Sequence, residues 1–288
     1  MTRHGITDVS RPRSREQRLA GGWPSLREFS GRSSISILLA ALLCTACAKG
    51  HGGKPATPPT PNRVLYERAK GLIDQGRFEK AREALTEVGT HETVEPGLDP
   101  LVKIAVADAY FYQPGIENII EAQSRYSQFV SFFPTHDLAG YAQFQIGMCD
   151  LKQSIDSFLD QTFTHKAIEE FDRVKAVDPG SRFVQAAEQM KIRCTGKIAN
   201  HDYDVGVFYF KKKAWKGAVG RFKKLIEESP QYDDSDGAYY YLGVALVRDG
   251  SQPEGRIYLE KLARDYPRSQ FISRAKTEIA KLPEASGQ

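Results

Sequence analysis

Small, aromatic and proline residues recur at fixed spacings along this chain. A small residue is followed four positions later by an aromatic residue or leucine, and twelve positions later by a proline. The four full copies are Ala122, Tyr126 and Pro134; Ala167, Phe171 and Pro179; Ala218, Phe222 and Pro230; and Gly255, Leu259 and Pro267. A fainter copy has Ala81 and Leu85, with Thr93 in place of the proline. Residues four apart share one face of a helix, and proline ends a helix, so the pattern predicts repeated helices.

A second small residue precedes several copies by twelve positions, namely Ala69, Gly206 and Gly243. Small residues on both helices of a pair let the two backbones approach closely where they cross. Such self-similarity is typical of tetratricopeptide repeats, although an unrelated helical bundle could show it by chance. We therefore predict an all-α fold, a right-handed superhelix of about five tetratricopeptide-like helix pairs with a C-terminal capping helix.

The repeat domain is expected to cover residues 63–283, followed by a disordered tail at 284–288. The expected helices are 63–75, 78–88, 101–113, 116–132, 137–152, 166–177, 181–213, 215–228, 236–248 and 253–264, with a cap at 270–282. Asp236 is expected to cap its helix. Residues 153–165 form an insertion with Phe158 and Phe163, which either packs back on the array or lies near a partner.

The amino-terminal segment is typical of a lipoprotein signal peptide. Arg32 precedes an apolar run, residues 35–43, that is too short to span a bilayer. The run ends in Leu-Cys-Thr-Ala-Cys, and Ala46 before Cys47 resembles a bacterial lipobox. We predict that residues 1–46 are a signal peptide with an over-long amino terminus and that Cys47 carries the lipid. An ordinary secreted protein and an uncleaved anchor are the alternatives.

Residues 47–62 are rich in proline and glycine and are expected to be a disordered tether behind the lipid. In polyproline conformation the tether would reach roughly 45 Å, at ~3.1 Å per residue. Ala48, rather than an aspartate, follows Cys47. The predicted location is therefore the outer membrane, lipid-anchored and facing the periplasm.

The formal net charge of +4 does not indicate a basic partner-binding domain. Seven of the 40 basic residues and three of the 36 acidic residues lie in residues 1–46, so the remainder is formally neutral. Charge therefore gives no support to nucleic-acid binding.

No catalytic, cofactor or metal-binding motif can be assembled from the sequence. The six histidines are scattered, and the zinc-protease, phosphate-loop and nucleophile-elbow motifs are missing. Asp233, Asp234 and Asp236 lack the glycine and glutamate of a calcium loop. Cys149 and Cys194 either form a disulfide or are buried apolar side chains. We predict a protein that is not an enzyme and that needs no cofactor or metal.

One region has a local excess of positive charge. Lys211, Lys212 and Lys213 end a predicted helix, and Lys216, Arg221, Lys223 and Lys224 follow. The lysines either form a solvated helix end that complements the helix dipole, or the region binds an acidic partner. Nearby, Tyr203, Phe208, Tyr209, Phe210 and Trp215 are expected to lie mostly in the core. At least one of Tyr239, Tyr240 and Tyr241 should be exposed, because consecutive helical residues cannot all face inward.

Two phrases of the sequence resemble the BamD family of outer-membrane assembly lipoproteins, over roughly residues 64–268. The first joins Ala109-Tyr-Phe-Tyr112 with Ala122, Tyr126, Phe129 and Phe133-Pro-Thr-His136. The second joins Tyr203-Asp-Val-Gly-Val-Phe-Tyr209 with Ala214-Trp-Lys-Gly-Ala-Val-Gly-Arg221. The second is the more specific phrase, because generic repeats rarely combine a tyrosine-rich helix, Ala-Trp and a following arginine.

This resemblance implies a scaffold of the outer-membrane β-barrel assembly complex. Its carboxy-terminal repeats would bind the periplasmic domain of the barrel-forming subunit, with Arg221, Lys216, Lys213 and Tyr209 as partner-binding residues. Its amino-terminal repeats would receive unfolded outer-membrane proteins, and other lipoproteins would complete the complex. The loop at 89–96 departs from the family pattern and weakens that assignment for the first repeat. The alternative is another repeat lipoprotein, either a secretin or pilus pilotin or a cell-wall coordination factor.

Overall fold

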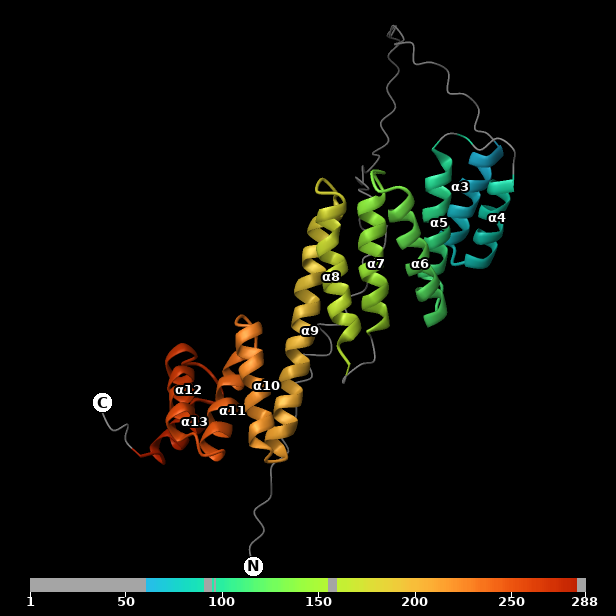
Figure 1. The fold of residues 1–288 in the computed structure, drawn as a ribbon. Helices are drawn as coiled ribbons and strands as arrows, with labels where there is room; N and C mark the ends of the chain where they lie inside the picture. Colours follow the sequence, from blue (N-terminus) through green and yellow to red (C-terminus); the bar gives the residue numbers. More distant parts are fainter. Residues whose placement is uncertain (1–60, 91–94, 96, 155–159, 284–288) are drawn as a thin grey trace, which may run out of the picture. The chain divides into compact units, whose positions relative to one another are not determined.

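The computed structural model describes residues 61–90, 95, 97–154 and 160–283, and these residues form eleven α-helices without a strand (Figure 1). The first six helices are α3 (Pro61–Asp74), α4 (Phe78–Thr90), α5 (Leu98–Tyr112), α6 (Ile116–Phe132), α7 (Ala139–Gln153) and α8 (Thr162–Val177). The last five are α9 (Phe183–Lys211), α10 (Trp215–Glu228), α11 (Ser235–Arg248), α12 (Gln252–Asp265) and α13 (Ile272–Ala280).

Successive helices pack in pairs: α3 with α4, α5 with α6, α7 with α8, α9 with α10, and α11 with α12. The all-α class and the tetratricopeptide-type pairing predicted from the sequence are therefore confirmed. The bounds of α6 and α10 agree with the prediction, whereas α5 begins earlier because Pro100 fits the first turn of a helix. The predicted tether ends sooner than expected, since α3 starts at Pro61.

The small residues lie where the helices of a pair cross, for the reason inferred from the sequence. A methyl group added at Gly206 would come within 2.8 Å of the Phe222 ring, and one at Gly243 within 2.7 Å of Leu259. Phe222 and Leu259 are fully buried. Each glycine therefore permits a close crossing that a larger residue would prevent.

The α7–α8 connection is shorter than the insertion expected at 153–165. Helix α8 already begins at Thr162, where the carboxylate of Asp160 accepts hydrogen bonds from the Thr162 backbone N–H (2.8 Å) and hydroxyl (2.6 Å). Phe163 consequently lies in α8 and is half-buried, packed near the Lys166 ammonium. Phe158 lies outside the described residues.

The carboxy-terminal helix α13 covers the end of the array, as predicted, but it is shorter than residues 270–282. Just before it, Phe271 is buried and stacks on Tyr240 with ring centroids 4.9 Å apart. The expectation that one of the three consecutive tyrosines is exposed is therefore wrong. Tyr239 is 7% exposed, and Tyr240 and Tyr241 are half-buried beneath the cap.

Asp236 does not cap α11, which begins one residue earlier at Ser235. One oxygen of its carboxylate accepts the adjacent Gly237 N–H at 2.7 Å, and the other accepts the hydroxyl of Ser269 at 2.5 Å, which ties the start of α11 to the segment before the cap. The expected signal peptide, Cys47, the tether up to residue 60 and the tail at 284–288 lie outside the described residues. Among the helices that are described, none has the length and apolar character needed to cross a membrane.

Candidate partner-binding surface

The four partner-binding residues expected from the sequence lie on the hairpin of α9 and α10. Tyr209 lies near the end of α9, Lys213 in the turn, Lys216 in the first turn of α10, and Arg221 in the middle of α10. Lys216 and Arg221 are five residues apart, so they point roughly 140° apart around the helix axis. The hairpin therefore presents two groups of residues rather than one.

The first group is an ion-pair cluster around a buried carboxylate. Asp202 in α9 is only 2% exposed, and its two oxygens accept Arg221 Nη1 at 2.8 Å and Lys224 Nζ at 3.0 Å. A buried carboxylate without such partners would cost several kcal/mol of stability. Arg221 therefore has a structural role between α9 and α10, while its side chain remains 38% exposed.

The second group surrounds the turn between the two helices. Lys213 has a left-handed backbone, with φ of 57°, and is the only described non-glycine residue with positive φ. The turn is closed by hydrogen bonds from Lys213 N–H to the Phe210 carbonyl (3.0 Å) and from Ala214 N–H to the Tyr209 carbonyl (3.0 Å). This is a Schellman motif, in which the left-handed position is usually glycine.

Lysines at this turn are free of internal ion pairs. Lys211, Lys213 and Lys216 are exposed, and in the described part of the chain no carboxylate pairs with any of them. The other basic residues of the region differ: Lys223 pairs with Glu254 at 2.6 Å, and Arg221 and Lys224 share Asp202. The basic run of the sequence thus divides into a structural half and an unpaired half.

Phe208 is the exposed member of the five aromatic residues that were expected to lie mostly in the core. Its side chain is 56% exposed, beside the ring of Tyr209 (centroids 5.8 Å apart) and the ammonium of Lys212 (5.9 Å from the Phe208 ring). The core face of α9 is occupied by Phe210, whose ring packs against Trp215 and Tyr241. Residues two apart on a helix point about 200° apart, so Phe208 could have been assigned outward once Phe210 was assigned inward.

Tyr209 is half-buried because its ring lies over Gly217. A methyl group added at Gly217 would come within 3.1 Å of the ring. The tyrosine is therefore partly exposed while its position is fixed by α10. We define the turn surface as Phe208, Tyr209, Lys211, Lys213 and Lys216.

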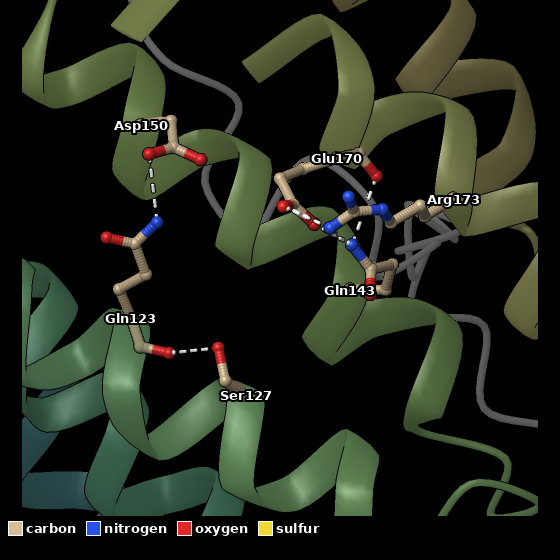
Figure 2. A network of polar contacts seen from close by, with 6 residues as sticks. All are labelled: Gln123, Ser127, Gln143, Asp150, Glu170 and Arg173. Atoms are coloured by element: carbon tan, nitrogen blue, oxygen red, sulfur yellow. Dashed lines mark hydrogen bonds and ion pairs between the residues drawn. The ribbon is translucent and has the colours of Figure 1, made fainter. Parts of the chain in front are cut away.

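A network of polar side chains joins α6, α7 and α8 (Figure 2). Gln123 donates to buried Asp150 at 2.9 Å, and Gln143 donates to Glu170 at 2.7 Å. Burial raises the pKa of Asp150, and the hydrogen bond from Gln123 opposes this rise. Arg173 completes the network through Glu170 at 2.5 Å. These groups pair with one another between neighbouring helices, so the network stabilises the array.

A second buried carboxylate lies between α5, α6 and α7. Asp108 is 8% exposed and accepts the hydroxyl groups of Tyr126 (2.5 Å) and Tyr141 (2.8 Å). Burial raises the pKa of Asp108 to about 6, although the two hydroxyl donors favour the charged form. Gln145 in turn donates to the Tyr141 oxygen at 2.8 Å.

Cys149 and Cys194 are free thiols, and both are fully buried. The disulfide alternative is therefore wrong for this structure, and the two residues pack as small apolar side chains in one core cluster. Burial raises the pKa of both thiols, that of Cys194 to about 11. A protonated, inaccessible thiol is a poor nucleophile.

The sequence matches one family model over most of its length. A family model described as "Outer membrane lipoprotein" (YfiO) matches residues 58–252, and a tetratricopeptide-repeat model matches residues 237–269. The outer membrane protein assembly factor BamD of Caulobacter vibrioides is 25% identical over 247 residues, which cover 84% of this chain and 79% of the relative. BamD of Xylella fastidiosa (strain Temecula1) is 25% identical over 254 residues, 83% of this chain and 85% of the relative.

The chain also has low-level similarity to two solved structures. The TPR2AB domain of yeast Sti1 in complex with pHSP90 covers 76% of this chain and 81% of its own, with 16% identity and a TM-score of 0.41. MamA covers 77% of this chain and 98% of its own, with 18% identity and a TM-score of 0.29.

Proposed function

Since this chain belongs to the outer membrane lipoprotein family that includes the BamD assembly factors, we propose that it is a non-enzymatic scaffold of the β-barrel assembly complex. Its relatives give it a role in outer-membrane protein assembly. In the proposed mechanism, the α9–α10 hairpin binds the periplasmic domain of the barrel-forming subunit. The amino-terminal repeats receive unfolded outer-membrane proteins, and other lipoproteins bind elsewhere on the array.

The turn surface is the observation that supports this proposal best. It combines three unpaired ammonium groups with an exposed phenylalanine and a fixed tyrosine. Its charge complements an acidic partner, which would increase the rate of association, and its aromatic side chains can fill apolar hollows on that partner. The complementary surface is therefore expected to carry carboxylates around an apolar depression.

Arg221 would make a second contact with the same partner. A guanidinium has five N–H donors, and the bond to Asp202 uses one nitrogen of the group. The 38% exposed side chain could thus bind a partner carboxylate while it stays fixed by Asp202. A pre-positioned arginine loses less side-chain entropy on binding than a mobile one.

The first helix pair has an open hollow that suits a peptide segment. Its volume is about 640 Å³, and Leu72 and Ala84 contribute apolar surface to it. Arg68, Arg77 and Glu83 are among the charged groups around it. Side chains of both charges beside a small apolar area would accept an extended segment of unfolded chain in this repeat.

Membrane attachment in this proposal depends on Cys47, with the following tether holding the array in the periplasm. Replacement of the thiol by Cys47→Ser should move the protein from the outer-membrane fraction to the soluble periplasmic fraction. Retention of this variant in the membrane fraction would contradict the lipid anchor.

Co-purification from native membranes tests the turn surface. The variant Lys213→Glu/Lys216→Glu changes two exposed residues without internal ion pairs, so the array should fold normally. We expect it to lose the barrel-forming subunit from the mild-detergent eluate, as measured by mass spectrometry. The matched control is Lys175→Glu/Lys276→Glu, which makes the same charge change on exposed positions of α8 and α13.

The control should recover the subunit at the wild-type level. Equal recovery by both double variants would overturn the assignment of the turn surface. Recovery of a secretin, pilus or cell-wall set of proteins from the wild type would instead overturn the assembly-complex proposal.

A further inference from the structure

Helix α9 crosses between two separate hydrophobic cores. Its first half contributes residues up to Cys194 to a core shared with α5–α8, and its second half contributes residues from Ala199 onward to a core shared with α10 and α11. Within the described chain, none of α3–α8 packs extensively against any of α10–α13. The two halves of the array are therefore joined chiefly by one continuous helix (Figure 1).

The segment between the two cores, residues 195–198, contains two residues of low helix propensity, and its buried Ile198 belongs to neither core cluster. Thr195 is exposed and β-branched, and Gly196 follows it. A methyl group added at Gly196 would meet no atom within 4 Å, so packing does not require glycine there. This distinguishes Gly196 from Gly206, ten residues later in the same helix, because Gly206 is needed where α9 crosses α10. Glycine inside a helix lowers its stability and is a common position for bending.

Side-chain contacts from this segment and from Asn200 just after it reach both halves of the array. The Lys197 ammonium donates to the carbonyl and the hydroxyl of Ser154 at the end of α7. Asn200 accepts the hydroxyl of Tyr232, next to α11, at 2.9 Å. A long lysine side chain and a single phenol hydroxyl can retain their bonds through a small rotation, unlike an interdigitated core.

We propose that residues 195–198, centred on Gly196, are a hinge within α9 that lets the two halves of the array change their relative orientation. The hinge separates the half that carries the turn surface from the half that carries the first three helix pairs. A ligand that binds one half and prefers one relative orientation would raise the population of that orientation. It would thereby change the affinity of the other half for its own partner. The hinge itself does not depend on the identity of either ligand.

The test compares Gly196→Ala with Gly220→Ala in the full-length protein. Gly220 in α10 is also a helical glycine whose added methyl group would meet no atom within 4 Å, so it is a matched control. Both variants should raise the folding equilibrium constant, by roughly two- to fivefold, because alanine favours the helix. Neither should disturb the fold.

Distances are then measured by electron–electron double resonance between spin-labelled non-natural residues at exposed positions. The pair Glu169 and Glu227 reports across the hinge, and the pair Gln128 and Glu169 reports within the first half. We expect a broader distribution across the hinge, narrowed by Gly196→Ala and unchanged by Gly220→Ala. Equal widths for the two wild-type pairs, or the same response to both variants, would overturn the proposal.

Discussion

Lys213 has a backbone conformation that glycine has at the corresponding turns of two other hairpins. Gly76 between α3 and α4 and Gly250 between α11 and α12 have φ of 74° and 97°, with the same pair of closing hydrogen bonds. A side chain in the left-handed region costs roughly 1–2 kcal/mol. A strained lysine in the middle of the turn surface is consistent with selection for its charge rather than for stability.

Replacing this lysine should therefore stabilise the protein. We expect Lys213→Gly to raise the free energy of unfolding by about 0.5–1 kcal/mol, since relief of strain exceeds the entropy that glycine adds to the unfolded chain. Urea unfolding measures the change. Lys212→Gly is the control. Lys212 has a right-handed backbone (φ −80°), so glycine relieves no strain there and the free energy of unfolding should fall.

Arg221 is expected to affect folding as well as binding. Arg221→Gln leaves Asp202 with Lys224 alone and should lower the free energy of unfolding by about 1–3 kcal/mol. Asp202→Asn in the same chain removes the buried charge and should recover most of that loss. Chemical denaturation of the two single variants and the double variant measures the coupling.

Strictly additive losses would show that the Arg221–Asp202 pair has no energetic role. Arg221→Glu is a poorer probe of binding, because it places a second carboxylate beside Asp202. A loss of partner after that change would report on the fold and on the surface together.

Asp108 should make stability depend on pH. Its pKa of about 6 in the folded chain exceeds the ordinary aspartate value of 3.8, so the folded protein binds this proton more tightly than the unfolded chain. The stabilisation that comes from this raised pKa is therefore complete below about pH 4 and is lost as pH rises through 6. The free energy of unfolding falls by about 3 kcal/mol over that range. Unfolding of the wild type and Asp108→Asn at several pH values measures it.

As pH rises from 4 to 6, the free energy of unfolding of the wild type should fall relative to that of Asp108→Asn. Above pH 7 the difference between the two proteins should stay constant. A difference independent of pH would show that Asp108 titrates normally in the folded protein.

At the scale of a helix pair, a glycine at the point where the two helices cross is required for stability. Gly206→Ala would place a methyl group 2.8 Å from Phe222, which is fully buried and cannot move aside. The strain, about 1–3 kcal/mol, exceeds the helical advantage of alanine, so the free energy of unfolding should fall. Thermal unfolding measures this, and Gly220→Ala should show the opposite sign because its methyl group meets open space.

The helices themselves could be predicted because their signals are local. Prolines after α6, α8, α10 and α12 and small residues at the crossings follow from helix geometry within one pair. The exposure of individual aromatic residues could not be predicted in the same way. Tyr240 is covered by Phe271, thirty-one positions later in the sequence, and such a contact leaves no local pattern.

The candidate site was predictable to the level of the hairpin and no further. The Ala-Trp phrase and the basic run identified α9 and α10, and four residues on them. Which cations are unpaired depends on Asp202 and Glu254, which lie in α9 and α12. Only the folded chain brings those carboxylates beside Arg221, Lys224 and Lys223, and so separates structural from available charge.

At the scale of the whole molecule, the array is a series of neighbouring contacts that share helices. Repeat proteins gain stability from each pair and from each interface with the next pair. Here α5 and α9 share one core cluster, and each also contributes to a second cluster of its own. A change in α9 is therefore expected to affect both halves, whereas a change in α13 should affect only the carboxy-terminal end.

Because α9 contributes to two core clusters, it also sets the order in which the two halves of the array can fold during synthesis. The core of α5–α8 needs Phe183, Met190 and Cys194, so it stays open until the first half of α9 has appeared. Once that half is helical, it is a preformed nucleus from which the remaining turns can propagate without a new initiation cost. The completed half of the array would then template the start of the other, and assembly would proceed from the amino-terminal repeats to the hairpin that carries the turn surface.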